Sequence, residues 1–232
     1  MNLWAFTSFF TSLFLSNFLH VYFYRKTPKY LLSDGDRKEW SSRILSTISS
    51  VIVGYGSVLY LMDASKMRFF INSILLCKGF LVYDIYSVIV NRNHYKTMTV
   101  LETLMHHTLV VLLPHSLFDS HGEIVAFGFL SEWSTPFLNN CWFMKKSGWG
   151  AGGWRKNIFN AIAVTTVFIF MLVRPINFLV QFLVLLVIGV SWQGYAIVLG
   201  ILYLNVQWAH KLLVMLKKNI HQQQPQSAAP LS

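Results

Sequence analysis

Two adjacent histidines, His106 and His107, lie inside an apolar run of the sequence. Ionisable groups at membrane depth are costly, so they mark candidate functional sites. An imidazole titrates near neutral pH, so one ring could act as a general base while the other orients it or binds substrate. The alternative is a polar pair that hydrogen-bonds across helices and fixes their packing. Spacing alone leaves both interpretations open.

The same spacing argues against a metal site. Neighbouring residues on a helix point about 100° apart, so two adjacent rings do not readily share one ion. The sequence also lacks the repeated His-x-x-His-His clusters that diiron hydroxylases and desaturases use. We therefore predict no bound metal.

A polar stripe follows in the next apolar run. Glu132, Thr135 and Asn139 stand at positions i, i+3 and i+7, which share one face of a helix. A polar face on an apolar helix points into the bundle or towards a water-filled cavity. Glu132 could pair with a histidine or with Arg174, and a structural ion pair competes with a catalytic role. Arg174 could instead extend to water.

Asp84, beside Tyr83, is a further acidic group within an apolar run. The same two interpretations apply to Asp84, and Tyr83 is expected at the interface or lining the bundle. Asn205 and Trp208 share a face of the last apolar run, where we expect packing rather than binding.

Small residues recur every four positions near the second apolar run. This stripe consists of Ser42, Ser46, Ser50 and Gly54. Small-residue stripes let helix backbones approach closely in lipid, so we expect helix packing here and no chemistry. The two cysteines, Cys77 and Cys141, both lie in apolar runs and are expected to be packed thiols.

The composition indicates a membrane protein. Of 232 residues, 54% are hydrophobic and 12% are charged, whereas soluble domains carry about 25% charge. The net charge of +10 does not indicate nucleic acid, because the basic residues lie in short loops between apolar runs.

Seven apolar runs are long enough to be considered as membrane helices, given that about 20 residues cross the hydrocarbon core. They cover residues 3–24, 44–62, 69–90, 103–118, 122–144, 158–190 and 195–216. The fourth is short and contains Pro114, and Pro136 is expected to kink the fifth. Arg174-Pro175 interrupts the sixth, so its span is expected to end near residue 173. The sequence thus predicts an all-α, polytopic membrane helical bundle of six or seven transmembrane helices.

The distribution of charge predicts the orientation. With seven spans and the N-terminus outside, the inside loops are residues 25–43, 91–102 and 145–157, and they and the tail hold most of the loop Lys and Arg. The outside loops hold two basic residues, Lys66 and Arg68. This arrangement satisfies the positive-inside rule.

An ordered set of residues across these runs resembles the TLC-domain family, which includes the ceramide synthases. The set comprises Tyr83-Asp84, His106-His107, Glu132-x-Ser134-Thr135-Pro136-Phe137-x-Asn139, Arg174 and Asn205-x-x-Trp208. The resemblance implies an endoplasmic-reticulum membrane protein whose helices surround a lipid-accommodating cavity, with the N-terminus lumenal and the C-terminus cytosolic. Another endomembrane or the plasma membrane is the alternative location.

We expect three parts in the chain, and the resemblance covers the second. Residues 1–42 form an N-terminal helix and cytoplasmic loop, residues 43–218 form the TLC-type bundle, and residues 219–232 form a disordered tail rich in Gln, Pro, Ala and Ser.

In the ceramide synthases the two histidines are the presumed acyl-transfer centre, which carries over to His106 and His107. A downstream His-Asp pair of that branch is absent here, where the chain reads Ser131-Glu132-Trp133-Ser134-Thr135. The pattern is more similar to the small non-synthase branch, which is linked to lipid homeostasis and membrane composition.

We therefore expect a multi-pass membrane protein of lipid homeostasis that binds or senses an acyl lipid, with membrane lipids as partners and no cofactor. The first alternative is an acyl-CoA-dependent acyltransferase, with acyl-CoA as co-substrate and the histidine pair catalytic. The second is a membrane sorting or scaffold protein. The residues expected to line the lipid site are Asp84, Tyr83, Glu132, Thr135, Asn139 and Arg174.

Overall fold

The computed structural model describes residues 3–31, 33–94, 97–112 and 116–221, and every regular element in these ranges is helical. The α-helices are α1 (Leu3–Arg25), α2 (Asp34–Met62), α3 (Met67–Val90), α4 (Thr97–Val111), α5 (Ser116–Leu130), α6 (Ser134–Lys146), α7 (Gly153–Met171), α8 (Asn177–Ile188) and α9 (Trp192–His221). Short helical turns are η1 (Ala64–Lys66), η2 (Arg92–His94), η3 (Ser131–Trp133) and the π-helical η4 (Leu172–Ile176). The all-α prediction is confirmed for the described part of the chain.

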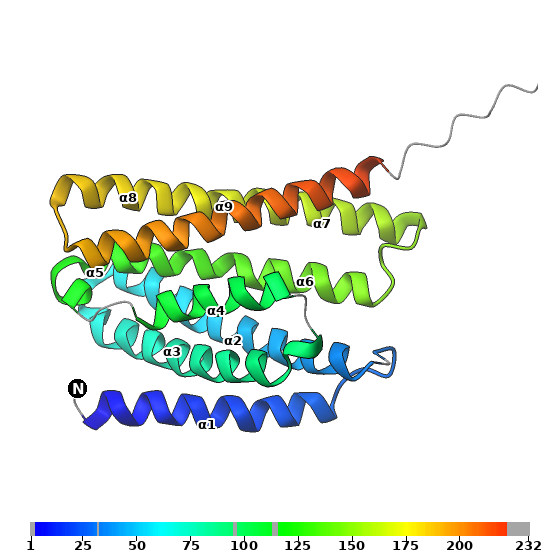
Figure 1. The fold of residues 1–232 in the computed structure, drawn as a ribbon, viewed down its shortest axis with the longest axis horizontal. Helices are drawn as coiled ribbons and strands as arrows, with labels where there is room; N and C mark the ends of the chain where they lie inside the picture. Colours follow the sequence, from blue (N-terminus) through cyan, green and yellow to red (C-terminus); the bar gives the residue numbers. More distant parts are fainter. Residues whose placement is uncertain (1–2, 32, 95–96, 113–115, 222–232) are drawn as a thin grey trace, which may run out of the picture.

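The helices lie side by side in one elongated bundle, and the chain reverses direction at each connection except two (Figure 1). α5 continues through η3 into α6, and α7 continues through η4 into α8, so each pair runs the length of the bundle as one rod. The end of the bundle where α1 begins also holds the α2–α3 and α8–α9 connections. The opposite end holds the α3–α4 and α6–α7 connections and the end of α9.

Both interrupted rods break next to a proline. Pro136 has no N–H to donate to the carbonyl of residue 132 and its ring crowds that turn, so the helix tightens into η3 just before it. Pro175 lies inside the π-helical turn η4. The hydrogen bonds of a π-helix join residues i and i+5, so this turn is wider than an α-helical turn. Both interruptions occur where the sequence predicts them, but the rod continues past η4 to Ile188, so the expectation that this span ends near residue 173 is wrong. Pro114 lies outside the described residues, as do residues 222–232 of the tail.

Four helical segments among the described residues are long and apolar enough to cross a membrane. They are Asp34–Met62, Ala64–Val90, Gly153–Ile188 and Trp192–Lys218. Large apolar side chains on the outside of the bundle, such as Phe14 and Phe168, are well exposed. Hydrocarbon is a suitable solvent for such a surface, whereas water is not. The multi-pass membrane class is therefore supported by length, composition and surface.

Two apolar clusters form the interior. The larger lies among α2, α3 and α5 and is centred on Val53, Phe70 and Ala126, all completely buried. α1 packs on α3 at Gly79, where an added Cβ would lie 2.7 Å from the carbonyl oxygen of Phe9. The smaller cluster lies between α8 and α9 and borders the cavity described below.

Candidate functional site

The buried guanidinium of Arg174 organises a polar cluster inside the bundle. The η4 turn places this side chain, which is 4% exposed, against η3, α6 and α9. Its Nε donates to Ser134 Oγ at 2.6 Å and its Nη2 donates to Thr135 Oγ1 at 2.8 Å. Its Nη1 lies 3.4 Å from the acceptor Asn205 Oδ1, and Nη2 lies 3.6 Å from Glu132 Oε1. The guanidinium is therefore held within the bundle and does not extend to water.

The carboxylate of Glu132 receives its hydrogen bonds on one oxygen. Ser50 and Thr135 both donate to Oε2, each at 3.1 Å. Oε1 faces Arg174, and the side chain is 17% exposed. A buried carboxylate needs a counter-charge and donors, and the cluster provides both.

His106 lies on the α9 side of α4. Its ring packs edge-on against Trp208, with centroids 5.0 Å apart. The indole Nε1 donates to Glu102 Oε2 at 3.1 Å, and Lys211 Nζ donates to the same carboxylate at 2.6 Å. His106 is 7% exposed, and its buried Nδ1 has no hydrogen-bond partner among the described residues.

His107 points to a different neighbour. Its Nδ1 lies 3.5 Å from Asp84 Oδ2, although the geometry does not meet that of a hydrogen bond. Ser42 donates to Asp84 Oδ1 at 2.7 Å. Tyr83 is also buried, and the ring of His20 from α1 lies 5.7 Å from its ring. His107 and Asp84 thus form a histidine–carboxylate pair between α4 and α3.

Asn139 takes its contacts from α2. Its Nδ2 donates to Ser46 Oγ and Thr47 Oγ1, each at 2.9 Å, and to the carbonyl of Arg43 at 3.0 Å. Arg43 Nη1 donates to Asn139 Oδ1 at 2.9 Å. The amide is fully used in joining α6 to α2, which suits a packing role.

The small-residue stripe of α2 supplies partners for three of the predicted site residues. Successive members of the stripe contact Asp84, Asn139 and Glu132, and Gly54 abuts Trp133, whose Nε1 would lie 2.7 Å from an added Cβ. The stripe therefore lies at close helix contacts, as expected, and its serines also hydrogen-bond to predicted site residues. The sequence signal for these hydrogen bonds is the four-residue period of the serines, because it places several hydroxyls on one face of α2, where each can donate to an acceptor on the facing helix.

An apolar cavity opens beside this polar cluster. It is partly open to the surroundings. Its walls come from α4, α5, η3, α8 and α9, and the apolar lining includes Val110, Phe129, Phe178, Leu185, Val198 and Ile201. His106, Ser131 and Glu132 line it where η3 begins, Gln181 and Gly128 lie midway, and His121 lies towards the other end.

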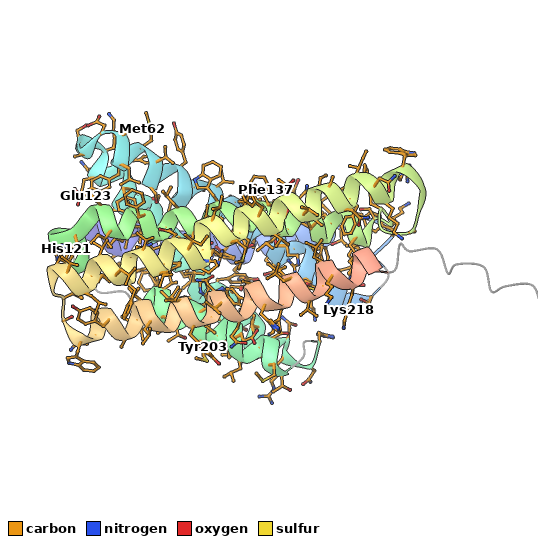
Figure 2. The ribbon with its side chains drawn as sticks, turned by 90° about the horizontal axis from the view of Figure 1, so that it is seen from above. Met62, His121, Glu123, Phe137, Tyr203 and Lys218 are labelled. Carbon is orange, nitrogen blue, oxygen red and sulfur yellow. The ribbon has the colours of Figure 1, made fainter. Side chains whose placement is uncertain are left out.

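His121 lies near the end of the bundle where α8 turns into α9, and Lys218 of α9 lies towards the opposite end (Figure 2). The backbone of His121 departs from helical geometry, with φ −147° and ψ 47°. From His121 to Glu132 the rod extends roughly 16 Å, at about 1.5 Å per helical residue. The lining of the cavity thus extends along α5 and is mostly apolar, with polar groups at both ends.

The structure brings together only part of the predicted set. Glu132, Thr135 and Arg174 contact one another, and Glu132 shares the cavity with His106. His107 and Asp84 form a neighbouring pair that does not line the cavity. Asn205 and Trp208, expected only to pack, contact Arg174 and Glu102. No group of three or more metal-ligating side chains occurs in the part of the chain that the structure describes, and both cysteines are free thiols.

These features define a multi-helix membrane protein in which buried, paired charges border an apolar cavity. A family model described as the TLC domain matches residues 39–216. The chain belongs to the TLC domain family, as the sequence resemblance indicates.

The chain is similar to curated proteins named TLC domain-containing protein 4. It is 27% identical over 232 aligned positions to the one from Homo sapiens, covering 88% of this chain and 85% of that protein. It is 28% identical to the one from Xenopus tropicalis, covering 78% of this chain and 76% of that protein. The Xenopus laevis protein named TLC domain-containing protein 4-A is 29% identical, with the same coverage. No solved structure matches the chain significantly.

Proposed function

We propose that this protein binds the hydrocarbon chain of a membrane lipid in the cavity among α4, α5, α8 and α9, and that it acts in lipid homeostasis. The observation that carries the proposal is a long apolar cavity ending in paired ionisable groups. Apolar walls accept an alkyl chain without a desolvation cost, and the polar groups fix the end of the ligand. Glu132 and Arg174 neutralise each other, so the ligand does not have to balance a buried charge.

The helix directions support seven crossings, with α1, α4 and the α5–α6 rod added to the four segments named above. Each connection then changes sides, and the basic loops after α1, α3 and α6 share one side with the end of α9. This side would be cytosolic and the N-terminus lumenal if the protein resides in the endoplasmic reticulum. Adding a glycosylation acceptor to the α2–α3 turn would test the orientation, since it is modified only on the lumenal side.

Lipid extraction from purified protein tests the proposed binding. Gly128→Leu places a side chain in the cavity, and its first carbon meets the amide oxygen of Gln181, a flexible group, at 3.2 Å. We expect lipid to co-purify with the wild type and to fall about tenfold in Gly128→Leu, a loss of about 1.4 kcal/mol in affinity. Ala161→Leu creates the same side chain at an exposed position on α7 and serves as the control.

Three results separate the candidate functions. If no lipid accompanies the wild type, or if Gly128→Leu retains as much as Ala161→Leu, the cavity does not hold lipid. In that case a sorting or scaffold protein is the better interpretation. Unchanged cellular lipid profiles after joint replacement of His106 and His107 by alanine would remove the role in lipid homeostasis.

The His107–Asp84 pair favours a second candidate, an acyl-CoA-dependent acyltransferase. A carboxylate 3.5 Å from a ring nitrogen can orient an imidazole that acts as a general base. His107 would take the proton of an amine or hydroxyl as that group attacks the thioester carbonyl, and the CoA thiolate would leave and be protonated. Incubation with labelled acyl-CoA and long-chain amines or alcohols tests this. Transfer must vanish in His107→Ala and fall in Asp84→Asn; equal transfer in all three proteins excludes it.

A further inference from the structure

At the end of the cavity beside η3, which we call the inner end, one partner of the Glu132–Arg174 ion pair lines the cavity and the other does not. Glu132 and His106 line the cavity, whereas Arg174 is absent from its lining and is 4% exposed. The negative partner of the ion pair therefore faces the ligand, and the positive partner lies behind it. This asymmetry has consequences for the chemistry of the head group.

The Arg174 guanidinium is already contacted by protein side chains. Three of its nitrogens contact Ser134, Thr135 and Asn205, and its Cζ lies 5.4 Å from the centroid of the Phe170 ring and 5.9 Å from that of Trp208. A carboxylate or phosphate on the ligand would have to displace these partners to reach the charge. It would also approach the Glu132 carboxylate, and like charges repel strongly where water is excluded.

Two polar atoms at the same end of the cavity have no hydrogen-bond partner among the described residues. Both hydrogen bonds that reach Glu132 from described residues end on Oε2, so Oε1 can accept another. The His106 ring is more than nine-tenths buried and its Nδ1 has no hydrogen-bond partner among the described residues. Buried polar atoms are normally paired, and an unpaired one beside a cavity points to a ligand.

We infer that the cavity selects a lipid whose inner end is an uncharged hydrogen-bond donor, a hydroxyl or an amide, and discriminates against anionic head groups. The hydroxyl donates to Glu132, and its oxygen or a second donor pairs with His106. The paired charges of Glu132 and Arg174 leave no net charge for an ionic head to neutralise, so neither an anion nor a cation is favoured. This inference rests on the proposed lipid binding and adds the class of head group.

Displacement of labelled hexadecanol from the purified full-length protein tests the inference. The competitors share one chain length: hexadecanol, hexadecane, hexadecanesulfonate and hexadecyltrimethylammonium, whose charges do not depend on pH. We expect hexadecanol to compete at least about tenfold better than each of the other three. If none of them, hexadecanol included, binds, the proposed lipid site itself fails. If either ion or the alkane competes as well as hexadecanol, lipid binding survives and the head-group inference is overturned.

Glu132→Gln gives an independent measurement. The amide keeps the shape but removes the negative charge, so the charge of Arg174 is no longer balanced, and hexadecanesulfonate should gain about tenfold relative to hexadecanol. His106→Phe keeps an aromatic ring against Trp208 and removes the ring nitrogens, so it should weaken hexadecanol and leave hexadecane unchanged. An unchanged ranking of competitors in His106→Phe would contradict the inference, even if Glu132→Gln does not fold.

Discussion

The ring of Trp208 lies edge-on to the ring of His106, with centroids 5.0 Å apart, and its indole N–H donates to Glu102. Glu102 stands one helical turn before His106 on α4, so the contact holds α9 against α4 at the histidine. One aromatic side chain thus positions the ring that borders the cavity and joins two helices far apart in the sequence.

Truncation of Trp208 is the first test of this relationship. Trp208→Ala should lower the free energy of unfolding by about 3–5 kcal/mol, because it removes a large packed ring. It should also release His106 and weaken lipid binding. Trp208→Phe keeps ring packing and loses the N–H, so it should cost only about 1–3 kcal/mol. Thermal unfolding measures the loss of stability, and the amount of lipid that co-purifies measures the loss of binding. Trp192→Ala is the control, since Trp192 is 74% exposed. An equal effect of Trp192→Ala would contradict the role of Trp208 in positioning His106.

Removing the buried cation should be more damaging than removing the whole ion pair. Arg174→Met leaves the partly buried Glu132 carboxylate without its counter-charge, at a cost of about 3 kcal/mol. The double variant Arg174→Met with Glu132→Gln should recover part of that loss. Arg155→Met on the exposed side of α7 provides the matched control. Unfolding midpoints in detergent show which of the single and double variants is less stable. If the losses from the two single changes add up in the double variant, Glu132 and Arg174 are not coupled.

The close approach of α1 to α3 depends on Gly79. Gly79→Ala places a carbon 2.7 Å from a backbone oxygen of α1, which cannot move without the helix. We expect a loss of about 1–3 kcal/mol and faster proteolysis of the loop between α1 and α2. Gly150→Ala meets only Phe159, at 3.9 Å, and should leave both quantities unchanged. Equal proteolysis of the two variants would mean that α1 docks by other contacts.

The turn between α2 and α3 should respond to acid. The Ser65 hydroxyl and backbone N–H donate to the Asp63 carboxylate, and these bonds hold the pKa of Asp63 below its usual value of 3.8. A lowered folded-state pKa stabilises the protein above the unfolded-state pKa, and this contribution disappears as pH falls through the folded-state value. The unfolding midpoint of the wild type should therefore fall more steeply below about pH 4 than that of Asp63→Asn. Identical pH profiles would exclude the contribution.

Much of the architecture could be predicted from the sequence, because a membrane limits the possible elements. Long apolar runs must become helices, and prolines 136 and 175 had to interrupt them where the backbone loses a donor. The candidate residues were also readable, since ionisable side chains in apolar runs stand out from their neighbours. The pairing of Glu132 with Arg174 was one of two possibilities that the sequence left open.

Packing decided the partners. Adjacent residues on a helix point in different directions, and the sequence does not say which direction faces the cavity; the fold turns His106 to the cavity and His107 to Asp84. The serines of α2 look like spacers until α3 and η3 bring Asp84 and Glu132 within reach of their hydroxyls. The sequence by itself determined which helices and which polar groups the protein has. Only the tertiary structure decided which of those groups meet, because contacts between helices depend on how their faces rotate and pack together.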